Sequence, residues 1–177
     1  LVPNDFSFGE LPEDFEHFEP YLKHAIKRIP ALEQAGIRKF FCGPESFTPD
    51  GNYLLGETPE IKNFFVCCGF NSIGLASSGG AGRATAEWMI NGGISEDIFS
   101  LDISRFEKFH SEIKFITERV TETLGDLYAM HWPYKQHTTS RNQKILPYHN
   151  HLKEAGACFG VGGGFERPMW YALNDNK

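Results

Sequence analysis

One segment constrains the fold more than any other, because it joins an apolar run to a glycine-rich turn and then to a helical pattern. Residues 64–70, FFVCCGF, form a continuous apolar run, which is typical of a β-strand covered on both faces. NSIGLASSGGAG follows, and ATAEWMI then has a helical pattern that Asn91-Gly92-Gly93 can end. The segment predicts a strand–turn–helix unit, and the chain as a whole an α/β fold of the mixed α+β kind.

The turn and helix start between Gly69 and Gly82 contain residues with almost no side-chain bulk. Glycine at a helix start costs roughly 0.5–1 kcal/mol per residue relative to alanine. Two things could offset that cost: close approach of a flat ligand to the backbone, or tight contact with another helix or a sheet. A ligand would meet unpaired N–H groups and the positive end of the helix dipole, which suits a group that gains negative charge. The residues alone leave both explanations open.

The GAGRAT stretch within this segment is not a dinucleotide fingerprint. It lacks the third glycine, and it lies too far beyond the expected strand end for the first turn of a βα unit.

Elsewhere the pattern predicts several further elements. Pro20 is expected to open a helix and Pro30 a short helical turn, followed by a strand over Ile37–Phe41 and a turn-rich stretch over residues 43–51. Apolar residues from Phe106 to Leu127 recur at spacings of three and four, which predicts one long amphipathic helix packed on a neighbouring domain. HLKEAG and ACFGV predict a short helix and a short strand near the end.

Composition excludes several classes of function. The net charge is -6 and lysine and arginine form no run, so neither nucleic acid nor an anionic membrane surface is an expected partner. No stretch approaches the roughly 18–20 apolar residues of a membrane span, and no signal-peptide pattern opens the chain. The four cysteines have no C-x-x-C spacing, which predicts buried free thiols in a reducing compartment. The first residue is Leu, which suggests a piece of a longer protein.

Other candidate residues have simpler explanations. His149-Asn150-His151 lacks a plausibly spaced third ligand, so we expect a polar turn that caps the next helix and no metal site. Asp50 stands between Pro and Gly and is expected to be a turn residue more than a catalytic base. Trp88 is expected in the core. The sequence identifies no catalytic residue.

Three stretches in the first half of the chain, GPESFTPDG, YLLGETPEIKNFFVCCGFNSIGLASSGGAG and AEWMINGG, resemble the last part of the FAD-dependent oxidoreductase domain of dimethylglycine and sarcosine dehydrogenases. LDISRF, the segment around Arg141, LKEAGACFG and GFERPMWYA look like the central and linker region of the same enzymes. The resemblance runs from about Pro3 to Ala172. It implies three parts: residues 1–93 as the C-terminal part of the FAD domain without its N-terminal Rossmann half, residues 94–150 as the central domain, and residues 151–177 as the start of an aminomethyltransferase domain.

The resemblance also implies a flavin site. The residues that would line the flavin are consecutive: Gly69, Phe70, Asn71, Ser72, Ile73, Gly74 and Leu75. The backbone amides of Ser72 to Leu75 would lie on the pyrimidine edge, and Pro49-Asp50 would sit in the loop leading toward it. Two positions depart from the simpler sarcosine oxidases. Ala76 stands where those enzymes bind the substrate carboxylate with lysine, and Gly43, next to Cys42, stands where they link the flavin to cysteine.

The function implied is oxidation of an N-methylated glycine by hydride transfer to FAD, with one-carbon capture by tetrahydrofolate at a site outside this chain. The partner would be a small N-methyl amine, and the electron acceptor and the mode of FAD attachment stay open. The compartment would be the cytoplasm or the mitochondrial matrix, and the 177-residue chain alone is expected to be inactive. Two alternatives stay open: a non-catalytic regulatory subunit of the pyruvate dehydrogenase phosphatase type, which shares the GPESFTPD-like stretch, and a scaffold without flavin.

Overall fold

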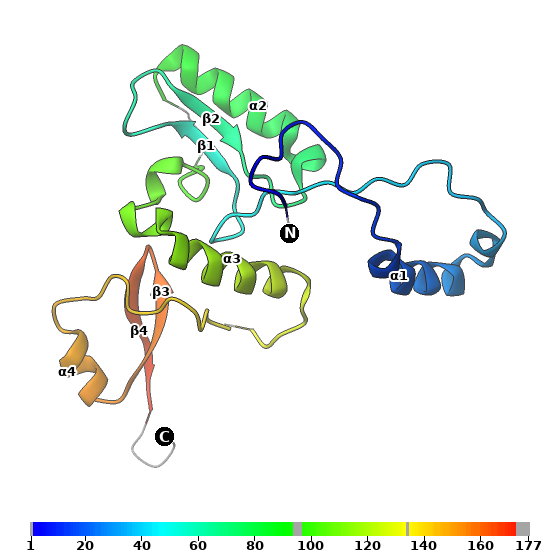
Figure 1. Cartoon of the computed structure of the whole chain (residues 1–177). Helices are drawn as coiled ribbons and strands as arrows, with labels where there is room; N and C mark the ends of the chain where they lie inside the picture. Colours follow the sequence, from blue (N-terminus) through cyan, green and yellow to red (C-terminus); the bar gives the residue numbers. More distant parts are fainter. Residues whose placement is uncertain (1, 94–96, 134, 173–177) are drawn as a thin grey trace. The chain divides into compact units, whose positions relative to one another are not determined.

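The computed structural model describes residues 2–93, 97–133 and 135–172. The chain forms two compact units, Leu1–Glu45 and Ser46–Lys177. Both contain helices, and the second adds two small antiparallel sheets, which confirms the expected mixture of α and β structure (Figure 1).

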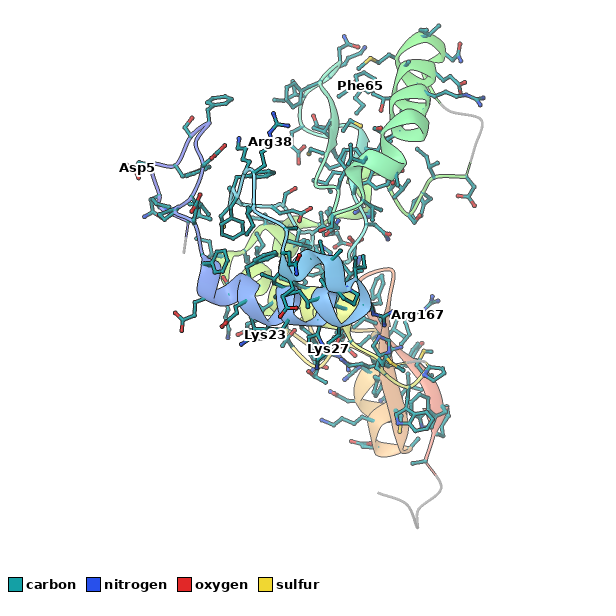
Figure 2. The ribbon with its side chains drawn as sticks, turned by 90° about the vertical axis from the view of Figure 1, so that its right-hand side faces the viewer. Asp5, Lys23, Lys27, Arg38, Phe65 and Arg167 are labelled. Atoms are coloured by element: carbon teal, nitrogen blue, oxygen red, sulfur yellow. The ribbon has the colours of Figure 1, made fainter. Side chains whose placement is uncertain are left out.

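The first unit contains the helix α1 (Phe15–Arg28) and the 3-10 turn η1 (Pro30–Glu33). The prediction that Pro20 opens the helix is wrong, because the Asp14 side chain accepts a hydrogen bond from the His17 N–H at 2.9 Å and starts the helix earlier. Pro20 therefore lies inside α1 and removes one backbone hydrogen bond from it. Lys23 and Lys27, one turn apart, are both exposed on this helix (Figure 2).

Aromatic contacts hold the first unit together. The ring of Phe40 lies 5.6 Å from that of Phe15 and 5.2 Å from that of Phe18, between centroids. The predicted strand over Ile37–Phe41 is wrong: the segment is irregular, and an isolated bridge follows it, in which the Leu11 N–H donates to the Cys42 carbonyl at 2.8 Å. The side chain of Phe40 contacts α1, and the described residues offer this segment no neighbouring strand.

The second unit begins with the strands β1 (Leu54–Glu57) and β2 (Phe65–Cys68), which pair antiparallel. The helix α2 (Gly74–Asn91) lies along this hairpin (Figure 1) and ends at Gly92, whose φ of 73° is left-handed. Phe65, labelled in Figure 2, meets the ring of Trp88 edge-on at 6.3 Å. A Cβ on Gly56 would lie 2.5 Å from the same indole, so the close packing requires glycine. The strand–turn–helix prediction is confirmed.

The expectation that this strand is covered on both faces is wrong, and so is that of buried thiols. Cys67 and Cys68 are exposed, because within the described part of the chain the hairpin pairs with no third strand and has α2 as its neighbouring helix. Cys42 and Cys158 are half-buried, and all four cysteines are free thiols.

The predicted long helix begins later than expected. The helix α3 spans Ile113–Tyr128, and two 3-10 turns, η2 (Ile103–Arg105) and η3 (Lys108–Ser111), precede it. The Glu107 N–H donates to Nδ1 of His110 at 2.9 Å, which stabilises η3 as a separate turn. The apolar spacing continues from η3 into α3, and the ring of Phe109 packs edge-on against that of Phe115, at 5.3 Å between centroids.

The chain ends in the helix α4 (His149–Glu154) and an antiparallel hairpin of β3 (Ala157–Gly162) and β4 (Phe165–Tyr171). The predicted short helix and strand are confirmed, and GFERPMWYA supplies the partner strand. The expected capping role of the His-Asn-His turn is wrong: Tyr148 is the N-cap without a side-chain bond, and the His149 ring packs on Phe159 at 4.3 Å.

Among the described residues, no group of three His, Cys, Asp or Glu side chains could hold a metal ion, and no helix is long and apolar enough to cross a bilayer.

Polar ties join α3 to the segment that follows it. The Glu122 carboxylate accepts hydrogen bonds from the backbone N–H and hydroxyl groups of Thr138 and Thr139, at 2.5–2.9 Å. Burial alone would raise the pKa of Glu122, but these hydrogen bonds outweigh it and lower the pKa to about 2. The ionised carboxylate therefore stabilises the fold.

We predict that Glu122→Gln lowers the free energy of unfolding by about 1–3 kcal/mol at pH 7, because two backbone donors lose a charged acceptor. An unfolded glutamate has a pKa of about 4.3, so the contribution of Glu122 is complete above that pH and is lost as the pH falls through about 2. Urea unfolding of both proteins at pH 7, 5 and 3 measures this. A difference between them that stays constant across the three values would contradict the role of the ionised carboxylate.

Candidate flavin-binding site

The loop between β2 and α2 has an unusual backbone. Gly69, Asn71 and Ser72 have φ values of 70°, 47° and 67°, all in the left-handed region. Asparagine tolerates this region better than most residues, but serine rarely adopts it. At Gly69 a Cβ would also lie 3.0 Å from Cγ2 of Thr48. Contacts from elsewhere in the unit must therefore hold the loop in place.

The side chain of Asn71 supplies those contacts. It is 2% exposed, its Oδ1 accepts from the Thr48 N–H at 2.9 Å, and its Nδ2 donates to the Gly69 carbonyl at 2.7 Å. Nδ2 also lies 3.1 Å from Oγ1 of Thr48, whose hydroxyl donates to the carbonyl of Asn52 at 2.7 Å. The network ties the β2–α2 loop to the segment 46–52, across 23 residues of sequence.

Asp50 shapes the segment 46–52. Its Oδ1 accepts from the Asn52 N–H at 3.2 Å, which confirms the prediction of a turn residue. Both carboxylate oxygens also accept from the Arg105 guanidinium, at 2.7 Å from Nε and 3.1 Å from Nη2. This bidentate pair fixes Asp50 as part of the turn. The structure thus brings the Pro49-Asp50 loop and the Gly69–Leu75 loop together, with Thr48 as the link.

The start of α2 offers open hydrogen-bond donors. Its N-cap, Ile73, makes no side-chain cap, and the Ser77 N–H makes the first bond back to Ile73, at 2.9 Å. The amides of Gly74, Leu75 and Ala76 therefore have no partner within the helix. Leu75 is 100% exposed, and Phe70 stacks on Tyr53 at 4.7 Å.

These residues fit the edge of a flavin ring. Open amides at the positive end of a helix dipole favour the oxygen and nitrogen atoms of a pyrimidine that gains negative charge. The exposed side chains of Ile73 and Leu75 add apolar surface beside the amides. The hydrogen bonds of the Asn71 side chain hold the loop backbone, so the N–H groups at the start of α2 are positioned before any ligand binds.

The glycines further along α2 bear on the two explanations that the sequence left open. A Cβ placed on Gly79, Gly80 or Gly82 would meet nothing within 4 Å. Packing among the described residues therefore does not require glycine at these three positions. At Gly74, by contrast, a Cβ would touch Phe70 at 3.4 Å.

Sequence reasoning missed two side chains that support the loop, Thr48 and Tyr128. Thr48 stands in the GPESFTPDG stretch that resembles the FAD-dependent dehydrogenases, but no local pattern indicates its contact with Asn71. Tyr128 ends α3, and its hydroxyl donates to Oγ of Ser72 at 3.3 Å, across 56 residues of sequence. No local pattern could have indicated that contact.

Comparison with known proteins agrees with the resemblance to FAD-dependent oxidoreductases. The family "FAD dependent oxidoreductase" matches residues 3–88, and the family "FAD dependent oxidoreductase central domain" matches residues 91–145. The chain is 44% identical over 170 residues to 4-methylaminobutanoate oxidase (formaldehyde-forming) of Paenarthrobacter nicotinovorans, covering 96% of this chain and 20% of that protein. It is 39% identical to human mitochondrial sarcosine dehydrogenase, covering 96% of this chain and 19% of the enzyme.

A third relative, the mouse mitochondrial pyruvate dehydrogenase phosphatase regulatory subunit, is also 39% identical, over 95% of this chain and 19% of the subunit. The chain spans about a fifth of the length of the curated relatives it matches. Two family models of FAD-dependent oxidoreductases thus match most of the chain. The chain belongs to the FAD-dependent oxidoreductase family, in the group of sarcosine dehydrogenase and its relatives.

We predict that Asn71→Ala lowers the free energy of unfolding by about 2–4 kcal/mol, because it leaves the Thr48 N–H without its acceptor and keeps a side chain at positive φ. Asn71→Gly is the matched control: it loses the same hydrogen bonds but relieves the backbone strain, so it should cost less. Urea unfolding measures both. Equal stability of Asn71→Ala and the unmodified protein would show that the loop does not depend on this amide.

Proposed function

We propose that this chain supplies the pyrimidine-edge part of the flavin site, at Gly69–Leu75, in a dehydrogenase that oxidises N-methylated amino acids. FAD, when bound, would accept a hydride from the N-methyl carbon of the substrate. The observation that carries the proposal is the set of open amides at the start of α2, held in place by the buried Asn71.

The chain's own contribution would be to bind and orient. The segment Ser72 to Leu75 would lie on the pyrimidine edge, and the N–H groups of Gly74 and Leu75 would favour the negative charge that develops there on reduction. The Ile73 N–H already donates to the Phe70 carbonyl at 2.9 Å. Tyr128 would keep Ser72 in place from α3. The names of the relatives support the substrate class, since one is an oxidase of a methylamino acid and another a sarcosine dehydrogenase.

The proposal extends to the organisation of the parent protein. Residues 1–93 would end the FAD domain, residues 94–150 would form the central domain, and residues 151–177 would begin an aminomethyltransferase domain. Tetrahydrofolate bound outside this chain would capture the one-carbon unit. The compartment would be the mitochondrial matrix or the cytoplasm.

A regulatory role is the second candidate, and one observation favours it. The phosphatase regulatory subunit matches this chain as closely as sarcosine dehydrogenase does, at 39% identity. In that case the same fold would serve a protein without amine oxidation.

We predict that Leu75→Pro weakens the flavin site, because it removes one of the proposed flavin-facing N–H groups. Proline is tolerated in the first turn of a helix, and the preceding Gly74 has no Cβ to clash with the ring, so the fold should persist. The expected loss of FAD affinity in the full-length protein is roughly 5- to 13-fold, the effect of about 1–1.5 kcal/mol. Where FAD is covalently attached, the flavin midpoint potential should become more negative.

Leu75→Ala is the control for this change, since it keeps the N–H and removes the exposed side chain. It should bind FAD nearly as the unmodified protein does. If Leu75→Pro leaves both FAD affinity and midpoint potential unchanged, the amide does not meet the flavin.

Anaerobic titration of the full-length, FAD-loaded protein with sarcosine, dimethylglycine and 4-methylaminobutanoate distinguishes the two candidate functions. We expect at least one of them to bleach the flavin absorbance and, with an acceptor present, to release formaldehyde. A yellow protein that none of them bleaches would favour the regulatory function. A colourless protein that takes up no FAD would contradict the flavin site itself.

A further inference from the structure

The turn over residues 48–51 has a carbonyl group that the turn itself does not use. The Gly51 N–H donates to the Thr48 carbonyl at 3.3 Å and closes the turn, with Pro49 and Asp50 at its centre. The Pro49 carbonyl takes no part in that bond. Because Pro49 is half-buried, a partner elsewhere in the chain is needed to satisfy this acceptor.

The half-buried Thr123 of α3 is that partner. Its hydroxyl donates to the Pro49 carbonyl at 2.8 Å, across 74 residues of sequence. A Cβ placed on Gly51 would lie 3.5 Å from Cγ2 of Thr123, which is an ordinary van der Waals distance, so the methyl group packs on the same turn. One side chain of α3 therefore contacts the turn through both its polar and its apolar group.

His137 sets the direction of the Thr123 hydroxyl. Nε2 of His137 lies 3.2 Å from Oγ1 of Thr123, and the one hydroxyl proton is donated to Pro49, so the imidazole must be the donor to Oγ1. Burial, together with the charge of Arg119, lowers the pKa of His137 against the opposite effect of Glu122. The ring is therefore neutral at pH 7, with its proton on Nε2.

The contact at Pro49 is continuous with the network that holds the Gly69–Leu75 loop. Thr48, the preceding residue, donates its backbone N–H to Oδ1 of the buried Asn71 at 2.9 Å. Asp50, the following residue, forms the bidentate ion pair with Arg105. Three consecutive residues of the turn are thus held by side chains from three segments. Because they are consecutive, a shift of Pro49 would also move the Thr48 N–H away from Asn71.

We propose that Thr123 is a positioning residue for the flavin, which acts through the turn 48–51 and the buried Asn71 on the loop Gly69–Leu75. The inference rests on the proposed flavin site at that loop. Helix α3 lies in the segment that matches the central-domain family, whereas the loop lies in the segment that matches the FAD-dependent oxidoreductase family. The central domain would therefore help to set the electron affinity of the flavin although Thr123 does not touch the ring.

Thr123→Val in the full-length protein tests this role, because valine keeps the shape of threonine and lacks the hydroxyl. We expect FAD affinity to fall by roughly 2- to 13-fold, the range for one lost neutral hydrogen bond. The midpoint potential of the bound flavin should become more negative, since the N–H groups that favour its reduced form are held less firmly. Thr123→Ser keeps the hydroxyl and should restore both quantities.

Thr121→Val is the matched control on the same helix. Thr121 is exposed, and its hydroxyl donates to the Thr117 carbonyl at 2.7 Å within α3. The same substitution there should leave FAD affinity and midpoint potential unchanged.

Hydrogen exchange of the full-length protein, followed by mass spectrometry, measures the coupling in the backbone itself. Thr123→Val should accelerate exchange in residues 46–52 and 69–73, by a factor similar to the loss of FAD affinity. The β3–β4 hairpin should exchange as before, which distinguishes a local loosening from a general loss of stability. Unchanged exchange in both segments would overturn the proposal.

Leu75→Pro separates the role of Thr123 from the flavin site itself. If Leu75→Pro changes FAD affinity or midpoint potential and Thr123→Val changes neither, the flavin site stands and Thr123 does not position it. If neither variant changes either quantity, the flavin site is wrong and the role of Thr123 is wrong with it. An effect of Thr123→Val that Thr123→Ser does not restore, or that Thr121→Val reproduces, would also overturn the proposal.

Discussion

The candidate flavin site depends on one buried amide. Asn71 satisfies the buried Thr48 N–H and the half-buried Gly69 carbonyl at once. These bonds offset the unfavourable backbone of a loop in which Asn71 and Ser72 both have positive φ. The direction in which α2 leaves the sheet follows from that loop, and so does the position of its first amides. A purely apolar residue at this position could fill the space but could not hold the turn.

Hydrogen bonds and ion pairs between side chains and backbone hold much of the second unit together, because its apolar core is small. Among the described residues the buried apolar side chains are Leu55, Ala81 and Phe115. The hairpin β3–β4 is held to the segment before α4 by Arg141, which meets the almost fully buried Glu166, while the Asn142 N–H donates to the same carboxylate at 2.8 Å. That ion pair lowers the pKa of Glu166 and raises that of Arg141. Removing either partner would leave a buried charge without its counter-ion. Such an ion pair therefore favours one position of the hairpin relative to the segment before α4, and it adds little net stability.

Local signals in the sequence were sufficient where an element is specified by its own residues. The apolar run before Gly69 and the Asn91-Gly92-Gly93 stop delimit a real strand and helix. The predicted helix start at Pro20 was wrong because Asp14, six residues earlier, provides a side-chain cap. This cap outweighs the preference of proline for the first turn. The prediction of one long helix was wrong because the hydrogen bond between Glu107 and His110 closes a separate 3-10 turn before α3. The apolar spacing runs across both elements, so it does not reveal where one ends. Contacts such as Thr48 with Asn71 join residues 23 apart, and no periodicity encodes them.

Two groups of donors lack partners within the described chain, and the physical meaning differs between them. The first amides of α2 lie at an exposed helix start beside Leu75, where water can satisfy them at little cost. Their openness suits the edge of a flavin, and membership of the FAD-dependent oxidoreductase family supports the proposal of that ligand. Arg119 is different, because its Nε is sealed from water, and its charge is offset within the unit by the Thr139 and Ser140 carbonyls, the ring of Phe115 and the ionised Glu122. A buried guanidinium keeps its proton at neutral pH, so these partners must stay in place for α3 and the segment after it to keep their arrangement.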